Sequence, residues 1–200
     1  DIPVGISSNG WGVPAKEIDG RLGVYSKMTY EIPDKLQLEA FYMQTNAESS
    51  AKDLASFGND YGWNANFTNI GLKLLPTADV TFITQYLNGT TSMGESASHK
   101  PMVDNSFDSW FALLSYKFGK NRISYRHDYF EVKDNDPTAD KNAQVGSAET
   151  VCYSYALNEN DIIGAEYVKI LSHREGNSVL PGSGVDPDDN LMQINYRLYF

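Results

Sequence analysis

The sequence contains one cysteine, Cys152, among 200 residues. A single cysteine can form neither an intrachain disulfide nor an all-cysteine zinc site. The sequence also lacks the run of about 18 apolar residues that a membrane-spanning helix needs, which excludes a helical membrane protein. No charged and apolar leader opens the chain. We therefore expect that a secretion signal was removed, or that the sequence begins inside a longer protein.

Basic residues are scarce. There are 16 Lys and Arg against 26 Asp and Glu, giving a net charge of -10. Binding to a nucleic-acid backbone needs clustered cations, so we expect no nucleic-acid partner. The acid is concentrated in polar segments such as Asp134–Asp140 and Asp186–Asn190. Neither segment has the glycine and glutamate placement of an EF-hand, so we interpret them as solvated loops and expect no metal.

Catalytic motifs are missing as well. The sequence has no GxSxG nucleophile motif, no pair of histidines spaced as metal ligands and no glycine-rich phosphate loop. His127 and Asp128 are adjacent, but neighbours on a strand point to opposite faces and cannot act as a pair. The sequence therefore predicts a protein that is not an enzyme and that has no cofactor.

Aromatic residues, by contrast, are abundant at 12%, including 13 tyrosines. They fall in alternating segments rich in Val, Ile and Thr, which predict β-strands longer than those usual in soluble proteins. The expected strands are Arg21–Tyr30, Leu36–Thr45, Asn66–Leu75, Asp79–Asn88, Phe107–Phe118, Asn121–Val132, Glu149–Leu157, Asp161–Leu171 and Asn190–Phe200.

The expected connections alternate strictly between short and long. The short ones contain Pro, Gly, Asn or Asp, which favour tight turns, and cover Glu31–Lys35, Pro76–Ala78, Gly119–Lys120 and Asn158–Asn160. The long ones cover residues 46–65, 89–106, 133–148 and 172–189. Within the first, Ala47–Phe57 has the composition of a short helix ending at Gly58, which could fold inward and narrow a pore, although a surface loop is the simpler interpretation. Such alternation indicates an antiparallel meander with all long loops at one end.

The strands separate apolar from polar side chains. In the last strand, Ile194, Tyr196 and Leu198 share one face, while Asn195 and Arg197 share the other. A soluble barrel would turn the apolar face inward, whereas an outer-membrane barrel turns it outward, and alternation alone does not decide between them. Strand length, tyrosine content and the loop pattern favour the membrane protein.

The final strand ends in Phe200 and carries alternating apolar residues at Leu198 and Tyr196. This ending resembles the closing strand of the Gram-negative outer-membrane β-barrel porin superfamily. The resemblance covers the last eleven residues as a motif and residues 21–200 as architecture. It implies that Tyr196, Leu198 and Phe200 form a signal read by the barrel-assembly machinery.

With this resemblance, we predict an all-β fold, an antiparallel up-and-down transmembrane β-barrel in the bacterial outer membrane. Residues 1–20 are expected to be a loop leading into the barrel, and residues 21–200 its C-terminal portion. Nine strands are visible, and bacterial barrels have an even number, so we expect part of a porin barrel of about 16 to 18 strands. The expected partners are outer-membrane lipid, small hydrophilic solutes and other copies in a homotrimer. By alternation His127 faces outward, which a trimer contact or a local irregularity of the strand would explain equally well.

The predicted function is a porin-like channel for passive diffusion of small hydrophilic solutes, anions among them. A polar face turned inward would place the following charged residues along the pore: Arg21, Lys27, Glu39, Lys73, Lys117, Arg122, Arg126, Asp128, Glu166 and Arg197. Such a wall could favour anions, or its charges could cancel in pairs such as Arg126 with Asp128. The alternative function is a smaller or soluble β-barrel that binds a single small ligand.

Overall fold

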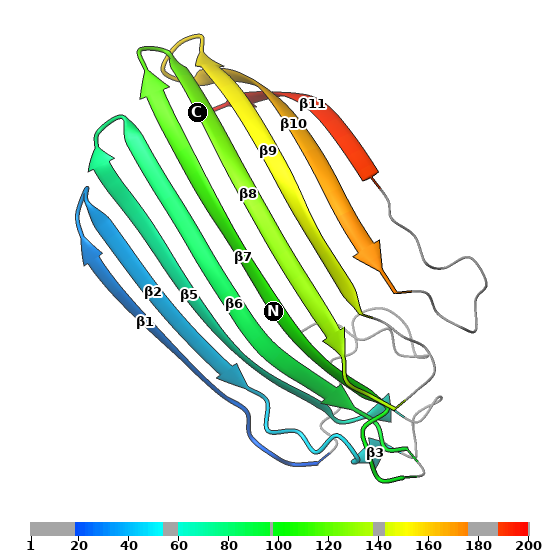
Figure 1. Ribbon diagram of the computed structural model, residues 1–200. Helices are drawn as coiled ribbons and strands as arrows, with labels where there is room; N and C mark the ends of the chain where they lie inside the picture. Colours follow the sequence, from blue (N-terminus) through cyan, green and yellow to red (C-terminus); the bar gives the residue numbers. More distant parts are fainter. Residues whose placement is uncertain (1–18, 54–59, 97, 138–142, 176–187, 200) are drawn as a thin grey trace.

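Nine long strands follow one another across a single curved sheet in the computed structural model (Figure 1). The structure describes residues 19–53, 60–96, 98–137, 143–175 and 188–199. The strands are β1 (Val24–Ile32), β2 (Leu36–Gln44), β5 (Trp63–Thr77), β6 (Val80–Met93), β7 (Val103–Phe118), β8 (Asn121–Asp134), β9 (Gln144–Ala156), β10 (Asp161–Arg174) and β11 (Asp188–Leu198).

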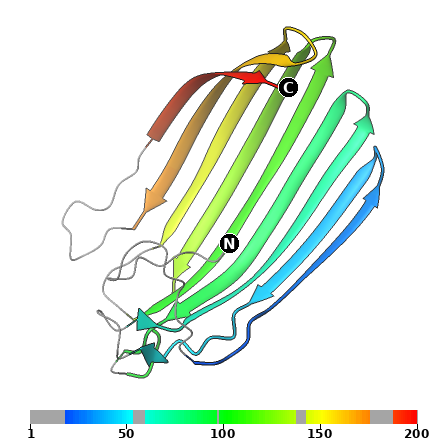
Figure 2. The same cartoon turned by 180° about the vertical axis from the view of Figure 1, so that it is seen from behind.

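Every strand pairs antiparallel with its neighbour in sequence, so the sheet is an up-and-down meander. The prediction of nine meandering strands is confirmed. Viewed from either side, the sheet is curved, and β1 and β11 are its two edges (Figures 1 and 2). Within the described residues, no helix has the length and apolar character needed to span a bilayer.

Except for β1 and β2, the strands extend further toward the long loops than the sequence predicted. β6 continues to Met93 rather than Asn88, and β7 already begins at Val103. Thr90, Thr91 and Ser92 pair in register with β7 although they lack an apolar face. Backbone pairing holds them in the sheet, which is why alternation of apolar residues did not reveal these strand ends.

A small two-stranded sheet, β3 (Lys52–Asp53) with β4 (Asp60–Tyr61), lies among the long connections. β3 falls within the segment Ala47–Phe57, for which the sequence offered a short helix beside the simpler surface loop. The helix is wrong for residues 47–53, which contain a turn closed by the Ala51 N–H donating to the Glu48 carbonyl. Residues 54–57 lie outside the described part of the chain.

The short turns form at the predicted places, and each has its own chemistry. Asp34 and Gly119 adopt left-handed φ angles of 58° and 61°, a conformation that Asp tolerates and Gly favours. The Asn158 Oδ1 accepts hydrogen bonds from the backbone N–H groups of Asn160 and Asp161, at 2.8 and 3.0 Å. These local bonds keep all four turns short and place them at one end of the sheet (Figure 1).

The two faces of the sheet differ in composition. One face, here called the outer face, carries the apolar side chains that alternation predicted to lie together. Many of its large apolar side chains are exposed, among them Ile70, Leu114, Val151, Ile163 and Ile194. No apolar side chain in the described residues is fully buried. None of the described residues packs on this apolar face, so the sheet has no core of the kind found in soluble proteins. An apolar face of this kind is suited to contact with lipid.

Tyrosine hydroxyls mark both ends of the apolar outer face. Toward the short turns, Tyr153 donates to Asn121 at 2.5 Å, and Tyr196 donates to Asp161. Toward the long loops, Tyr86 donates to Asp108 and Tyr167 to Asn190, at 2.6 and 2.7 Å. Each hydroxyl therefore points away from the middle of the sheet, as aromatic residues do at the two surfaces of a membrane.

The spacing of the two tyrosine sets fits a bilayer. Asn121, the acceptor at the turn end, starts β8. Across the strands, the loop-side acceptor Asn190 is in register with His127 of β8, and the loop-side acceptor Asp108 is in register with Glu131. These six and ten strand residues correspond to about 20 and 33 Å along the strand, on either side of the ~25 Å apolar band of outer-membrane barrels.

Candidate functional site: the concave wall

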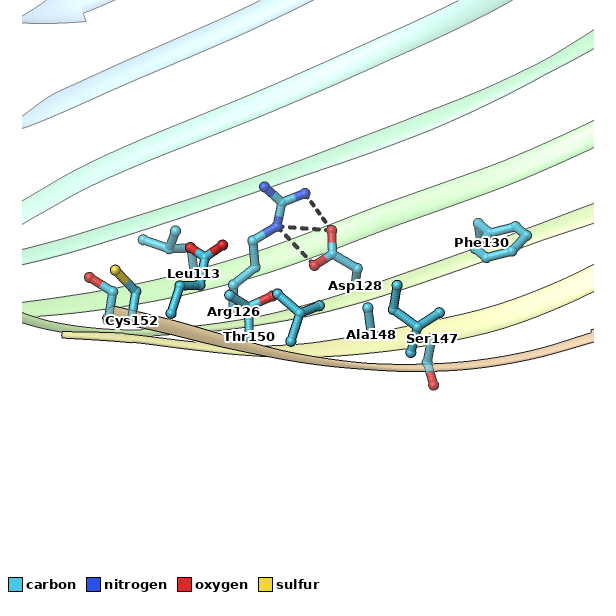
Figure 3. A pocket seen from close by; sticks show the side chains of 12 residues that line it. Leu113, Arg126, Asp128, Phe130, Ser147, Ala148, Thr150 and Cys152 are labelled. Atoms are coloured by element: carbon cyan, nitrogen blue, oxygen red, sulfur yellow. Dashed lines mark hydrogen bonds and ion pairs between the residues drawn. The ribbon is translucent and has the colours of Figure 1, made fainter. Parts of the chain in front are cut away.

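The polar face of the sheet is its concave face. A hollow of about 520 Å³ lies against β7 to β10, lined by Arg126, Asp128, Thr150, Glu166 and their neighbours in register (Figure 3). The side chains that alternate with these belong to the apolar outer face. Alternation along the strands did not show which of the two faces points inward. The curvature of the sheet shows that it is the polar face.

Nine of the ten charged residues predicted to line a pore share this concave wall. The strand register places all nine on the same face as Arg126, namely Lys27, Glu39, Lys73, Lys117, Arg122, Arg126, Asp128, Glu166 and Arg197. Their role in conduction remains a prediction.

Arg21 differs from the other nine. The sequence placed it at the start of the first strand, but β1 begins only at Val24, so that prediction is wrong. Arg21 forms an ion pair with Glu48, and its backbone N–H donates to Asp19 Oδ1 at 3.0 Å. Glycine at position 23 and the polar loop contacts end the strand pairing before Arg21. It therefore lies at the long-loop end, above the paired wall.

Two pairs of charges on the wall neutralise each other. Arg126 Nε donates to both oxygens of Asp128 at 2.9 Å, so the predicted local pair is confirmed in its geometry (Figure 3). The Lys27 Nζ lies 2.9 Å from Glu39 Oε2 on the neighbouring strand. Opposite charges in such contact stabilise the pairing of strands and largely cancel in the far field.

Aromatic rings also project from the concave wall, which the sequence analysis did not identify. The Arg126 guanidinium lies 4.1 Å from the centre of the Phe111 ring, and the rings of Phe41 and Phe67 are tilted toward each other with centroids 5.6 Å apart. The signal was present in the sequence, because these phenylalanines alternate in phase with polar residues. Register across strands was needed to show that they meet.

Glu149 is a second residue that the sequence analysis missed. It lies on the outer face and accepts hydrogen bonds from Tyr125, while its Oε1 is 2.6 Å from His127 Nδ1. The His127 ring also lies against Trp110, with centroids 5.1 Å apart. His127 is therefore on the outer face as predicted, with a cross-strand acid rather than Asp128 as its partner.

Comparison with known proteins identifies the architecture. No family model and no curated protein match the sequence. Two solved structures of OmpT from Vibrio cholerae share the fold. One, expressed in the outer membrane, aligns with a TM-score of 0.61 at 14% identity over 89% of this chain and 56% of that structure.

The fold is that of an outer-membrane β-barrel. The second OmpT structure, folded in vitro and described in a trimer form, aligns with a TM-score of 0.54 at 12% identity, over 85% of this chain and 52% of that one. The chain thus spans about half the length of each structure. The predicted location, the bacterial outer membrane, is confirmed at the level of the fold, and the porin superfamily itself is not shown by any sequence match.

One prediction from the sequence is corrected by these matches, namely that the chain is not an enzyme. It rested on missing nucleophile and metal-ligand motifs. A fold shared with two OmpT structures at 12–14% identity is compatible with an enzyme as well as with a channel. Because one fold hosts many activities, the absence of sequence motifs does not decide this point.

The remaining predicted positions fall at the ends of the chain. Tyr196 and Leu198 lie on the exposed outer face of β11, whereas Phe200 lies outside the described residues. Of the predicted N-terminal loop, residues 1–18 also lie outside them. Recognition of the last strand by an assembly machinery stays a prediction.

Proposed function

We propose that this protein forms a porin-like channel through which small hydrophilic solutes diffuse across the outer membrane. The observation that carries the proposal is the contrast between the two faces. The outer face is apolar and bordered by tyrosines, whereas the concave face carries charged and hydroxyl side chains such as Arg126, Asp128 and Thr150 among apolar ones such as Leu113 and Val168. A water-filled interior accounts for the polar wall, because lipid cannot solvate it.

The proposed channel requires a closed barrel. The edge strands β1 and β11 each have one neighbour among the described strands, and an unpaired edge is too costly within lipid. We propose that additional strands complete a barrel of about 16 to 18 strands, a size that leaves an aqueous lumen. The lengths of the two OmpT structures support this size.

The alternative function, a soluble barrel holding one ligand, needs the apolar face inside and the polar face in water. The described residues have the opposite arrangement, with exposed fractions of 52% for Leu114 and 73% for Ile194 on the outer face. The large exposed apolar belt favours the membrane channel.

Conductance in planar bilayers tests the proposed function. The full-length protein should give stepwise single-channel currents, and a bulky residue on the wall, Thr150→Trp, should lower the conductance of each step. Val151→Trp is the matched control, because Val151 is the next residue on β9 and faces outward. Absence of current steps from correctly folded protein, or equal conductance of both variants, would contradict a lumen along this wall.

We also propose that the channel assembles as a homotrimer in the membrane, supported by the trimer form of one OmpT structure. The outer face around His127 and Glu149 is a suitable contact, because polar groups there gain partners that acyl chains cannot offer. Molar mass by light scattering in detergent should correspond to three copies. A monomeric mass over a range of mild detergents would contradict the trimer.

A further inference from the structure

Two cations face each other directly at the short-turn end of the concave wall. Lys117 on β7 and Arg122 on β8 are partners in register, and both belong to the face that lines the hollow. Like charges directly opposite each other destabilise a strand pair. The placement of Lys117 opposite Arg122 therefore does not stabilise the sheet, which suggests a functional reason for it.

The Arg122 guanidinium is held in place by hydroxyl groups. Its Nη1 donates to Ser115 Oγ at 2.9 Å, and Ser124 Oγ donates to the same oxygen at 2.9 Å. Ser115 is only 4% exposed, so this anchor is shielded from water. A guanidinium has five N–H donors, and the bond to Ser115 uses one of them, so further donors of Arg122 remain for a ligand on the concave face.

These cations contrast with the other charges on the wall. Lys27 and Arg126 are each neutralised by a carboxylate at 2.9 Å. For Lys73, Lys117, Arg122 and Arg197, the described residues contain no carboxylate within 4 Å.

Two acids share this half of the wall. Glu31 lies near the turn end of β1, which is separated from β8 in the sheet by the four strands β2, β5, β6 and β7. Glu166 on β10 accepts a hydrogen bond at 2.7 Å from Nε2 of Gln193, its partner in register on β11. Neither one pairs with Lys117 or Arg122.

We infer that Lys117 and Arg122 form a subsite for small oxyanions, such as phosphate or carboxylate groups, and that they bias the channel toward anions. This inference rests on the proposed function. A guanidinium fork binds two oxygens of such an anion, and an ammonium group opposite it adds a point charge. In a confined aqueous path, uncompensated cations also raise the local concentration of anions.

Reversal potentials across a KCl gradient test the selectivity in planar bilayers, using the full-length protein and the variant Lys117→Gln/Arg122→Gln. We expect the ratio of chloride to potassium permeability to fall by about threefold or more in the variant. Lys169→Gln is the matched control, because it removes one cation from the outer face of β10 and should leave the ratio unchanged. An unchanged ratio in the conducting double variant would overturn the bias.

Binding of inorganic phosphate to the folded protein in detergent micelles tests the subsite without requiring conduction. We expect titration calorimetry to show weaker binding, by about threefold or more, for Lys117→Gln, which leaves the Ser115 anchor of Arg122 in place. Equal affinity in wild type, Lys117→Gln and Lys169→Gln would overturn the subsite. If wild type binds phosphate but passes no current, the proposed channel fails while the subsite stands.

Discussion

Gly89 lies where two phenylalanines approach the same backbone position on the concave wall. A Cβ atom there would come within 2.6 Å of Phe107 Cζ and Phe67 Cβ, and 2.5 Å of the Asn66 carbonyl oxygen. We expect Gly89→Ala to lower the free energy of unfolding by about 1–3 kcal/mol, because the rings and the backbone must move apart.

Urea titration in detergent micelles, followed by tryptophan fluorescence, measures this loss. Gly71→Ala provides the control, since Gly71 lies on the same face and its added Cβ would meet nothing closer than Glu39 Cβ at 3.9 Å. Similar losses in both variants would show that backbone freedom, rather than the close approach of the rings, makes glycine necessary at position 89.

At the level of single residues, the sequence predicted contacts between side chains of the same strand and missed contacts between side chains of neighbouring strands. Arg126 and Asp128 are two positions apart on β8, so alternation alone places them together. The partners Lys27 with Glu39 and His127 with Glu149 come from neighbouring strands. Their contact depends on register, which turns and bulges determine and which alternation does not report.

β9 offers a direct test of which face meets water. In a Cys152→Ser background, we expect Thr150→Cys and Ser154→Cys to react with a charged, membrane-impermeant thiol reagent, because both positions lie on the concave wall. Val151→Cys and Tyr153→Cys should stay unmodified in liposomes, because the outer face is covered by lipid. Mass spectrometry gives the labelled fraction. Reaction at the outward positions instead would reverse the proposed orientation of the sheet.

At the level of strands, the sequence located all nine but ended most of them too early on the loop side. Apolar alternation stops where a strand leaves the lipid, whereas backbone pairing does not. β9 starts at Gln144, five residues before the predicted Glu149, although Gly146 and Ser147 carry no apolar signal. The short turns were predicted well because Asp34, Gly119 and Asn158 form them through local chemistry.

The whole molecule has one end with short turns and one with long connections, and outer-membrane barrels expose the long end to the cell exterior. An epitope inserted after Ser98, between β6 and β7, should therefore bind antibody on intact cells. The same epitope between Gly119 and Lys120, in the turn from β7 to β8, should bind only after the outer membrane is permeabilised. Flow cytometry distinguishes the two, and equal staining of intact cells would contradict this topology.

At the level of the whole molecule, the order of the strands was predictable from the sequence, but the direction in which the sheet curves was not. Alternation in β11 separates Ile194 from Asn195 equally well for a soluble barrel and for a membrane barrel. The two kinds of barrel differ in which face becomes concave when the nine strands curve together. That curvature depends on the twist of the strands and on the side-chain volumes on both faces. Fold class and the residues that share the polar face were therefore predictable, whereas the curvature that makes this face concave was not.

The unequal ends of the meander also determine the route of assembly. Chains destined for the outer membrane arrive from inside the cell, so the end with the long connections must travel through the bilayer while the short turns stay behind. Those connections hold acidic residues such as Asp53 and Glu95, and each charge in transit meets the barrier of the hydrocarbon layer. Insertion is thus expected to be limited by the passage of hydrated loops rather than by pairing of strands, and to proceed faster where the bilayer is thin or locally disturbed.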